Sequence, residues 1–273
     1  MADPIDRGLL PESTVLSPGA TSIGGCDLLG LAAEYGTPLF VYDEQQLRDR
    51  CREAVAAFGD GVAYATKAFL CTAMARLAWE EGMCLDVATG GEAFVALHAG
   101  VPSDRLVLHG NNKSVAELDM ALRRSVRRVV IDSFAEIERI EALVSGGAPP
   151  PRALIRVNPG VDAHTHEYLA TAGADSKFGF ALRSGEAEAA VARVSASASL
   201  DLIGIHLHVG SQVLDISSFS RAISEVGSFV AGLRLPELSI GGGLGVAYNA
   251  GERAPSITEW AAAVTAACRA AGI

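Results

Sequence analysis

The chain has 273 residues, of which 49% are apolar and 20% charged, so it can bury a large core and is not disordered. Its 22 lysines and arginines stand against 32 acidic residues, and the net charge of -10 argues against a nucleic-acid partner, because phosphate binding needs a basic face. No apolar run approaches the roughly 18 to 20 residues of a membrane span. Five cysteines without C-x-x-C spacing favour reduced thiols, so we expect a cytoplasmic protein without a membrane partner.

After a lead segment at residues 1–36, short β-prone runs alternate with stretches of helical periodicity. The β-prone runs are Gly61–Ala65, Cys84–Ala88, Arg105–Leu108, Arg128–Ile131, Ala153–Val157, Leu202–Val209 and Glu237–Ile240. Helices are predicted between them at Thr72–Glu81, Gly91–Ala99, Val115–Ser125 and Phe134–Val144. Strands that alternate with helices predict parallel strands joined by right-handed crossovers.

Seven such units favour an α/β fold of the TIM-type (β/α)8 barrel kind over an open doubly wound sheet, because no early G-x-G-x-x-G turn is present. Pro255–Ile273 predicts the helix after the seventh strand, and no eighth strand follows it. Pro38–Tyr42 is β-prone and is expected as an extra strand outside the barrel. We therefore expect a lead segment at 1–36 and an incomplete barrel at 37–273.

Lys67 ends the apolar run of the first predicted barrel strand, where a barrel places its functional side chains. Between Tyr64 and Phe69 its amine would be partly desolvated, which lowers the pKa and favours a Schiff-base nucleophile. The alternative is an ordinary lysine that extends from a strand end to solvent.

The run Gly241, Gly242 and Gly243, with Gly245, follows the seventh predicted strand. Barrels often bind phosphate in the loops after strands seven and eight, and glycines let backbone N–H groups approach phosphate oxygens. The alternative is a flexible turn, but four glycines in five positions favour phosphate binding.

His206 and His208 are two residues apart on the sixth predicted strand, so both point to the same side. Three interpretations remain open: a metal pair helped by His164 and His166, an imidazole stacked on a flat cofactor ring with Ser211 donating to its phosphate, or core histidines. No acidic residue has a typical ligand spacing with these histidines, so we predict no metal.

Asp86 and Arg156 are charged residues on otherwise apolar strands, where burial is costly unless the charge is paired or used. They indicate either a structural ion pair in the barrel mouth or part of a site. The segment 109–114, His-Gly-Asn-Asn-Lys-Ser, is polar enough to line a site, or to cap the following helix through Ser114.

Taken together, these segments resemble the fold-type III pyridoxal phosphate decarboxylases, and most closely their diaminopimelate decarboxylase branch. The broad signals are Tyr64-Ala-Thr-Lys-Ala, His206-Leu-His-Val-Gly-Ser-Gln and the glycine run; the narrower ones are the segments 109–114 and 158–179. The resemblance implies a barrel of the alanine racemase-like kind and pyridoxal 5'-phosphate as the cofactor.

By this resemblance Lys67 carries the cofactor as an imine and His208 stacks on its ring, and these two are the catalytic residues. Ser211 with Gly241, Gly242 and Gly243 holds the phosphate. Asp86, Arg156 and His206 complete the expected cofactor-binding set.

The implied reaction is decarboxylation of meso-diaminopimelate, a small amino-acid substrate, to L-lysine. The family's eighth strand carries Glu-Pro-Gly-Arg, and its C-terminal β-domain carries a Cys-Glu-Ser-Gly-Asp motif that reaches a partner subunit. Neither motif occurs in the sequence, so we expect an incomplete form with little activity alone, and a homodimer for the full-length form. The alternatives are a non-catalytic barrel that binds pyridoxal phosphate and, less favoured, a metal-dependent barrel hydrolase.

Overall fold

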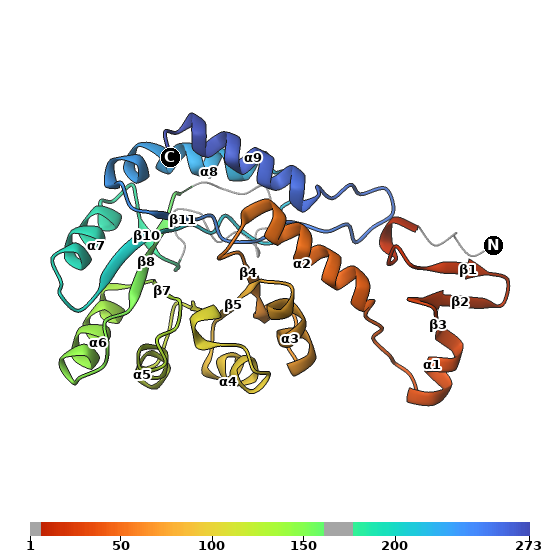
Figure 1. Cartoon of the computed structure of the whole chain (residues 1–273). Coiled ribbons are helices and arrows are strands. Elements are labelled where there is room, and N and C mark those ends of the chain that lie inside the picture. Colours follow the sequence, from red (N-terminus) through yellow and green to blue (C-terminus); the bar gives the residue numbers. More distant parts are fainter. Residues whose placement is uncertain (1–6, 161–176) are drawn as a thin grey trace.

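The structure is a computed structural model that describes residues 7–160 and 177–273 (Figure 1). Its main sheet follows the chain in the order β11-β10-β8-β7-β6-β5-β4, and every neighbouring pair is parallel. The seven strands are β4 (Ala63–Ala65), β5 (Cys84–Val87), β6 (Leu106–Leu108), β7 (Arg128–Ile131), β8 (Arg152–Asn158), β10 (Asp201–His206) and β11 (Glu237–Ser239). A two-residue strand, β9 (Phe180–Ala181), pairs with the end of β8.

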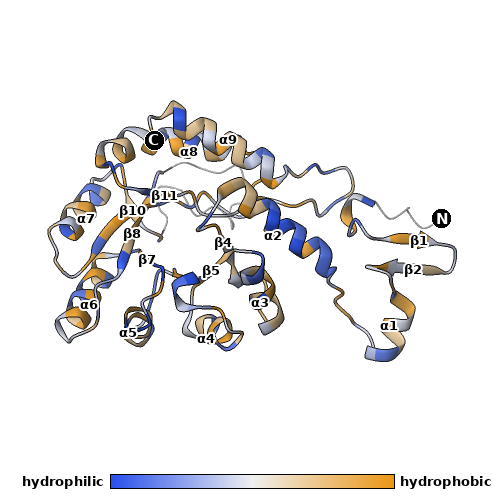
Figure 2. Ribbon diagram, viewed as in Figure 1, coloured by the Kyte–Doolittle hydropathy of each residue, from blue (hydrophilic) through white to orange (hydrophobic). Residues whose placement is uncertain are grey.

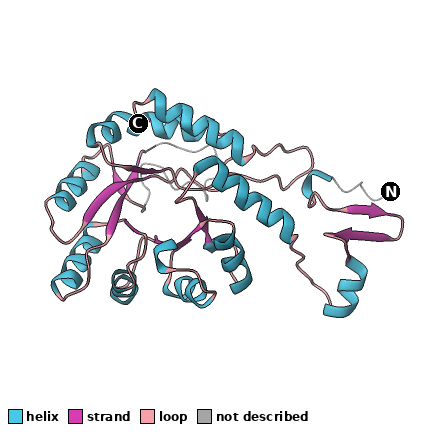
Figure 3. Cartoon of the chain, viewed as in Figure 1, coloured by secondary structure: helices cyan, strands magenta, loops and turns pink. Residues whose placement is uncertain are grey.

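The sheet is curled and carries its helices on the outside, as Figure 3 shows. The helices are α2 (Glu44–Phe58), α3 (Thr72–Glu80), α4 (Gly90–His98), α5 (Val115–Arg123), α6 (Phe134–Ser145), α7 (Glu186–Ser195), α8 (Ser217–Leu233) and α9 (Ile257–Ala270). Within the described residues, β4 and β11 form the two edges and do not pair with each other. The expected incomplete barrel is confirmed, and none of the described helices is long and apolar enough to cross a membrane.

Capping residues explain where several helices begin. Thr89, Ser114 and Ser256 accept a hydrogen bond from the backbone N–H three residues later, and a glutamate at that position bonds back to the capping residue. These capping boxes satisfy backbone groups that a helix start leaves unpaired. Ser114 therefore has the capping role that was one interpretation of the segment 109–114.

The core lies between the curled sheet and its helices. Leu85, Leu106, Leu108, Ile155 and Ile205 on neighbouring strands are completely buried. Figure 2 shows the hydrophobic strands inside and a strongly hydrophilic face on α2. This packing holds the C-terminal ends of the strands in fixed relative positions, and those ends carry the polar residues described below.

Helix α9 packs on both α8 and α2 (Figure 1). Its Trp260 ring lies edge-on to Phe58 of α2, with centroids 5.0 Å apart, and 5.2 Å from the ring of Phe219 in α8. Helix α2 precedes the edge strand β4, and α9 follows the other edge strand, β11. The contact between α2 and α9 therefore closes the layer of helices at the place where the described sheet is open.

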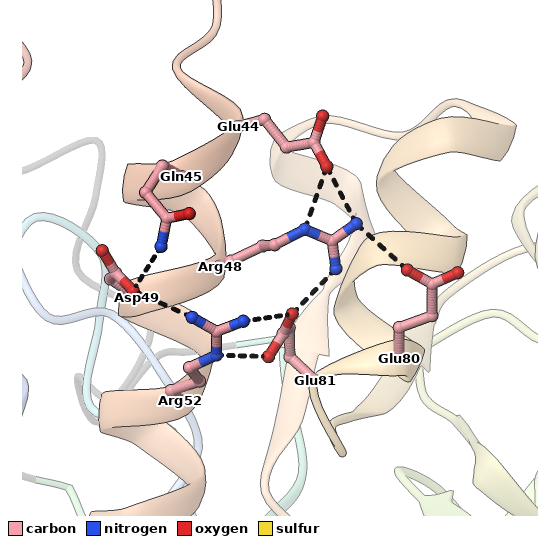
Figure 4. Close-up of polar contacts among 7 residues, drawn as sticks. All are labelled: Glu44, Gln45, Arg48, Asp49, Arg52, Glu80 and Glu81. Carbon is pink, nitrogen blue, oxygen red and sulfur yellow. Dashed lines mark hydrogen bonds and ion pairs between the residues drawn. The ribbon is translucent and has the colours of Figure 1, made fainter. Parts of the chain in front are cut away.

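A polar network ties α2 to the end of α3 (Figure 4). Glu81 accepts hydrogen bonds from Arg48 Nη1 at 2.8 Å and from Arg52 Nε at 2.6 Å. Both guanidinium groups lower the pKa of Glu81, Arg48 first. Glu44 and Glu80 also contact Arg48, so one arginine joins three carboxylates.

The N-terminal region differs from expectation. It contains a short helical turn (Arg7–Leu9), a three-stranded antiparallel sheet of β1 (Val15–Ser17), β2 (Ala20–Ile23) and β3 (Cys26–Asp27), and α1 (Leu28–Tyr35). The prediction of a strand at Pro38–Tyr42 is wrong: this segment has no strand partner within the described chain, and Phe40 is 86% exposed. β-prone residues form a strand only where a neighbouring strand accepts their hydrogen bonds, and this segment leads to the N-cap of α2 instead.

Candidate active site

Polar residues gather where the parallel strands end. Lys67 follows β4, His109 follows β6, Asp132 follows β7, and Asp86, Arg156, His206 and Ser239 lie on β5, β8, β10 and β11. Because the C-terminal ends of the strands meet at one mouth of the curled sheet, these side chains are brought to the same region. The contacts below show how they are joined.

Arg156 is the central charge of this mouth. It is 6% exposed, and its Nη1 donates to Asp132 Oδ1 at 3.2 Å and lies 3.4 Å from His109 Nε2. The other nitrogen of His109, Nδ1, lies 3.4 Å from Asp86 Oδ2. The two predicted charges, Asp86 and Arg156, are thus linked through His109, and the ion pair of Arg156 is with Asp132.

His206 and His208 are neutral at ordinary pH. Burial is the main cause that lowers the pKa of both histidines, and the charge of Arg156 lowers it further. The pKa of His206 falls well below its usual value, and that of His208 falls to about 3. His206 Nδ1 lies 2.8 Å from Ser239 Oγ, and its ring is edge-on to His109 at 4.5 Å. Neutral imidazoles of this kind can stack on a flat ring or exchange hydrogen bonds without carrying charge.

No metal cluster is found: the described ranges contain no group of three or more His, Cys, Asp or Glu that could hold an ion. His164 and His166, the suggested helpers of a metal pair, lie outside the described residues.

The glycine run is packed against the backbone that follows β10. A Cβ atom on Gly243 would lie 1.8 Å from the carbonyl oxygen of Gly210, and one on Gly241 would lie 2.4 Å from that of Leu207. Val213 N–H donates to Gly243 O at 2.8 Å, and Gly245 N–H donates to Val213 O at 2.9 Å. The run is therefore a fixed frame beside Ser211 and not a loose turn.

Lys67 lies in a 3-10 turn, Thr66–Ala68, directly after β4. Thr66 Oγ1 donates to the backbone oxygen of Asp86 at 2.8 Å and fixes this turn to β5. Lys67 follows the end of β4 and His208 follows the end of β10, so both lie at the same mouth of the sheet, and the charge of Lys67 lowers the pKa of His208 after burial and Arg156. The expected partial desolvation is wrong for this structure: Lys67 is exposed, because β4 is an edge strand with no described strand covering its far side.

Three residues of the mouth were not among the predicted site residues. His109 stands in the segment 109–114, which is polar enough to line a site, whereas Asp132 and Ser239 belong to no predicted site segment. Asp132 directly follows the predicted strand Arg128–Ile131, so the rule that barrels carry functional groups at strand ends could have found it. Ser239 lies inside a predicted strand and has no such signal.

The chain matches the family model of the pyridoxal-dependent decarboxylases, pyridoxal binding domain, over residues 44–271. The chain belongs to this family. It is 49% identical over 256 residues to the diaminopimelate decarboxylase of Mycobacterium tuberculosis, covering 89% of this chain and 57% of that protein. The corresponding enzyme of Bacillus subtilis is 42% identical over 257 residues, with coverage of 89% and 58%.

Solved structures agree with this assignment. The diaminopimelate decarboxylase of M. jannaschii in complex with L-lysine superposes with a TM-score of 0.88 at 29% identity, covering 95% of this chain and 63% of that one. The chain thus spans somewhat more than half the length of the relatives that it matches.

The residues of the mouth fit pyridoxal phosphate, the cofactor of the family. Among the described residues, Asp86 Oδ1 and His206 Nε2 are buried polar atoms without a hydrogen-bond partner. Such atoms are costly unless a ligand or water satisfies them. Beside them lie a neutral imidazole, His208, and a backbone frame at Gly241 and Gly243 that no side chain could occupy.

Proposed function

We propose that this decarboxylase domain acts on meso-diaminopimelate and releases carbon dioxide to give L-lysine. The observation that carries this proposal is the 49% identity to a named diaminopimelate decarboxylase over 256 residues. The joined set of Asp86, His109 and Arg156 supports it, because it provides charges and hydrogen-bonding groups at the mouth of the sheet.

Pyridoxal phosphate supplies an electron sink for the bond that breaks when carbon dioxide leaves. In our proposal, Lys67 holds the cofactor through its amine, and His208 packs its neutral ring against the pyridine. An uncharged ring is suited to that position, since it does not repel a protonated pyridine. Lys67 is exposed and so can be reached by an incoming aldehyde.

The phosphate is proposed to lie between Ser211 and the glycine run. Gly242 carries this part of the proposal, because a Cβ there would have no described heavy atom within 4 Å, whereas Gly241 and Gly243 are pressed against backbone. Open space beside a fixed backbone leaves room for an anion to approach N–H groups.

Asp86, Arg156 and His206 are proposed to complete the cofactor set. The unpartnered Asp86 Oδ1 and His206 Nε2 would bond to polar atoms of the cofactor. Arg156 adds a buried positive charge that forms an ion pair with Asp132.

We further propose an amino acid as the substrate, a cytoplasmic location, and a homodimer as the assembly of the full-length form. L-Lysine in the similar M. jannaschii structure supports an amino-acid ligand. Residues 1–36 are proposed as a separate lead segment before the barrel at 37–273.

The first test is the site of covalent attachment. The sequence contains three lysines, Lys67, Lys113 and Lys177, so a label can be assigned without ambiguity. Borohydride treatment of the chain mixed with pyridoxal phosphate should place a pyridoxyl mass on the Lys67 peptide. A label on Lys177 or Lys113 instead would contradict the proposed role.

The alternative is a barrel that binds the cofactor without catalysis. It is supported by the described residues of the mouth, which all suit the cofactor, whereas none of them is assigned to the substrate. Carbon dioxide release from meso-diaminopimelate separates the two. Turnover that the Lys67→Ala variant abolishes supports the decarboxylase. Because little activity is expected of the chain alone, cofactor binding at Lys67 supports the alternative only where no turnover at all is detected.

A further inference from the structure

A buried ion pair lies behind the mouth. Lys113 and Glu136 are each 2% exposed, and Lys113 Nζ lies 2.8 Å from Glu136 Oε1. The same ammonium donates to the backbone oxygens of Gly110 at 2.6 Å and Val130 at 2.7 Å. Two of its N–H donors thus serve backbone carbonyls, its charge faces the Glu136 carboxylate, and these contacts hold Lys113 behind the mouth.

The pair joins the two loops that carry His109 and Asp132. Lys113 belongs to the loop that begins with His109 after β6, and through Val130 O it holds that loop to β7. Glu136 lies in the first turn of α6, and its Oε2 accepts the backbone N–H of Asp132 at 3.1 Å. The ion pair therefore bonds to the residue next to His109 and to Asp132.

Stability alone does not require an ion pair here. Burial raises the pKa of Glu136, and the charge of Lys113 opposes that rise. A buried ion pair can often be replaced by apolar residues at no net loss of stability. An apolar pair, however, would not hold the carbonyl of Gly110 or the N–H of Asp132 by directed hydrogen bonds.

We propose that Lys113 and Glu136 are positioning residues that fix His109 and Asp132, and through them Asp86 and Arg156. His109 contacts both Asp86 and Arg156, and Asp132 contacts Arg156 and the backbone N–H of Gly179 at 3.1 Å. Two buried side chains thus set the geometry of the whole charged group. Where cofactor binding is the readout, this proposal rests on the proposed function. The histidine NMR signals described below do not depend on it.

The experiment compares three variants of the chain: Lys113→Met, Glu136→Gln and the double variant. Lys113→Met leaves a buried carboxylate unpaired, so its melting temperature should fall by several degrees. The double variant has neither charge and should recover most of that loss. Its dissociation constant for pyridoxal phosphate should nevertheless remain at least fivefold higher than that of the unmodified chain.

Two further measurements make the result specific. The imidazole NMR signals of His109 and His206, recorded without cofactor, should shift in the double variant, because the His109 loop has lost its anchor. Glu81→Gln is the matched control: it removes the carboxylate shared by Arg48 and Arg52 on the outer helices and should lower the melting temperature without changing cofactor affinity.

The outcomes are separable. If the histidine signals and the cofactor affinity of the double variant equal those of the unmodified chain, the proposal is overturned and the ion pair has a purely structural role. If the unmodified chain itself fails to bind pyridoxal phosphate, the proposed function fails, and the histidine signals then decide the positioning role alone. Should Lys113→Met not fold, Glu136→Gln and the double variant still give the comparison.

Discussion

At the scale of single residues, the mouth is organised by hydrogen bonds around one buried arginine. Arg156 meets Asp132 directly and Asp86 through His109. If His109 Nδ1 carries the proton, it donates to Asp86 while Nε2 accepts from Arg156, so a neutral imidazole satisfies both neighbours. The buried positive charge of Arg156 also favours the neutral forms of His206 and His208.

Gly242 allows the proposed phosphate site to be tested without disturbing the backbone frame. We expect Gly242→Asp to weaken pyridoxal phosphate binding by about tenfold, because one unfavourable charge contact costs about 1 to 2 kcal/mol. Gly242→Asn has nearly the same shape without the charge and is the control. Titration followed by the cofactor's absorbance gives both affinities, and equal weakening by Asp and Asn would contradict a phosphate at this position.

At the scale of elements, helix α9 joins the two ends of the helical layer. The completely buried Phe219 of α8 and Phe58 of α2 both pack against Trp260 of α9. Aromatic rings packed in this way account for much of the apolar area that a helix contact buries. The position of α9 relative to α2 and α8 therefore depends on a small number of rings.

Phe219→Ala should lower the free energy of unfolding by about 3 kcal/mol, because it leaves a cavity beneath α9. Phe40→Ala removes a ring that is 86% exposed and should cost little. Urea unfolding of both variants measures the difference. Similar losses for the two would show that the α8–α9 contact does not bear the stability assigned to it.

At the scale of the whole molecule, two histidines with lowered pKa values link stability to pH. His206 and His208 have folded-state pKa values far below the value of about 6.5 in an unfolded chain. Groups with a lowered folded pKa stabilise the fold above their unfolded pKa, and this contribution is lost as pH falls toward the folded pKa.

The free energy of unfolding should therefore fall between pH 6.5 and pH 3, with each histidine adding up to about 1.4 kcal/mol per pH unit. His208→Gln should have a shallower dependence below pH 6 than the unmodified chain. Urea unfolding at pH 7.5, 6 and 5 without cofactor provides the slopes. Parallel slopes would mean that the pKa of His208 is the same in the folded and unfolded states, which would contradict the prediction.

The sequence predicted the elements that hydrophobic periodicity marks strongly. Arg128–Ile131 is a strand with the predicted bounds, since four buried positions lie between clear helix signals. Pro38–Tyr42 failed because β propensity says nothing about whether a partner strand is present, and β1 to β3 were missed because strands of two to four residues show no period. Of the site, residues at strand ends could be predicted, whereas contacts such as His206 with Ser239 depend on the register of β10 against β11.

The position of α9 also has a consequence for the order of folding. Thr258, at the start of α9, donates through its backbone N–H to Glu53 of α2 at 3.0 Å, across 205 residues of chain. Closing so long a loop costs entropy that only the finished contact repays, whereas each strand and its neighbouring helix meet across a short stretch of chain. The strand-helix units can therefore assemble one after another during synthesis, and the face of α2 that contacts α9 stays exposed until α9, the last of the described helices, has been made.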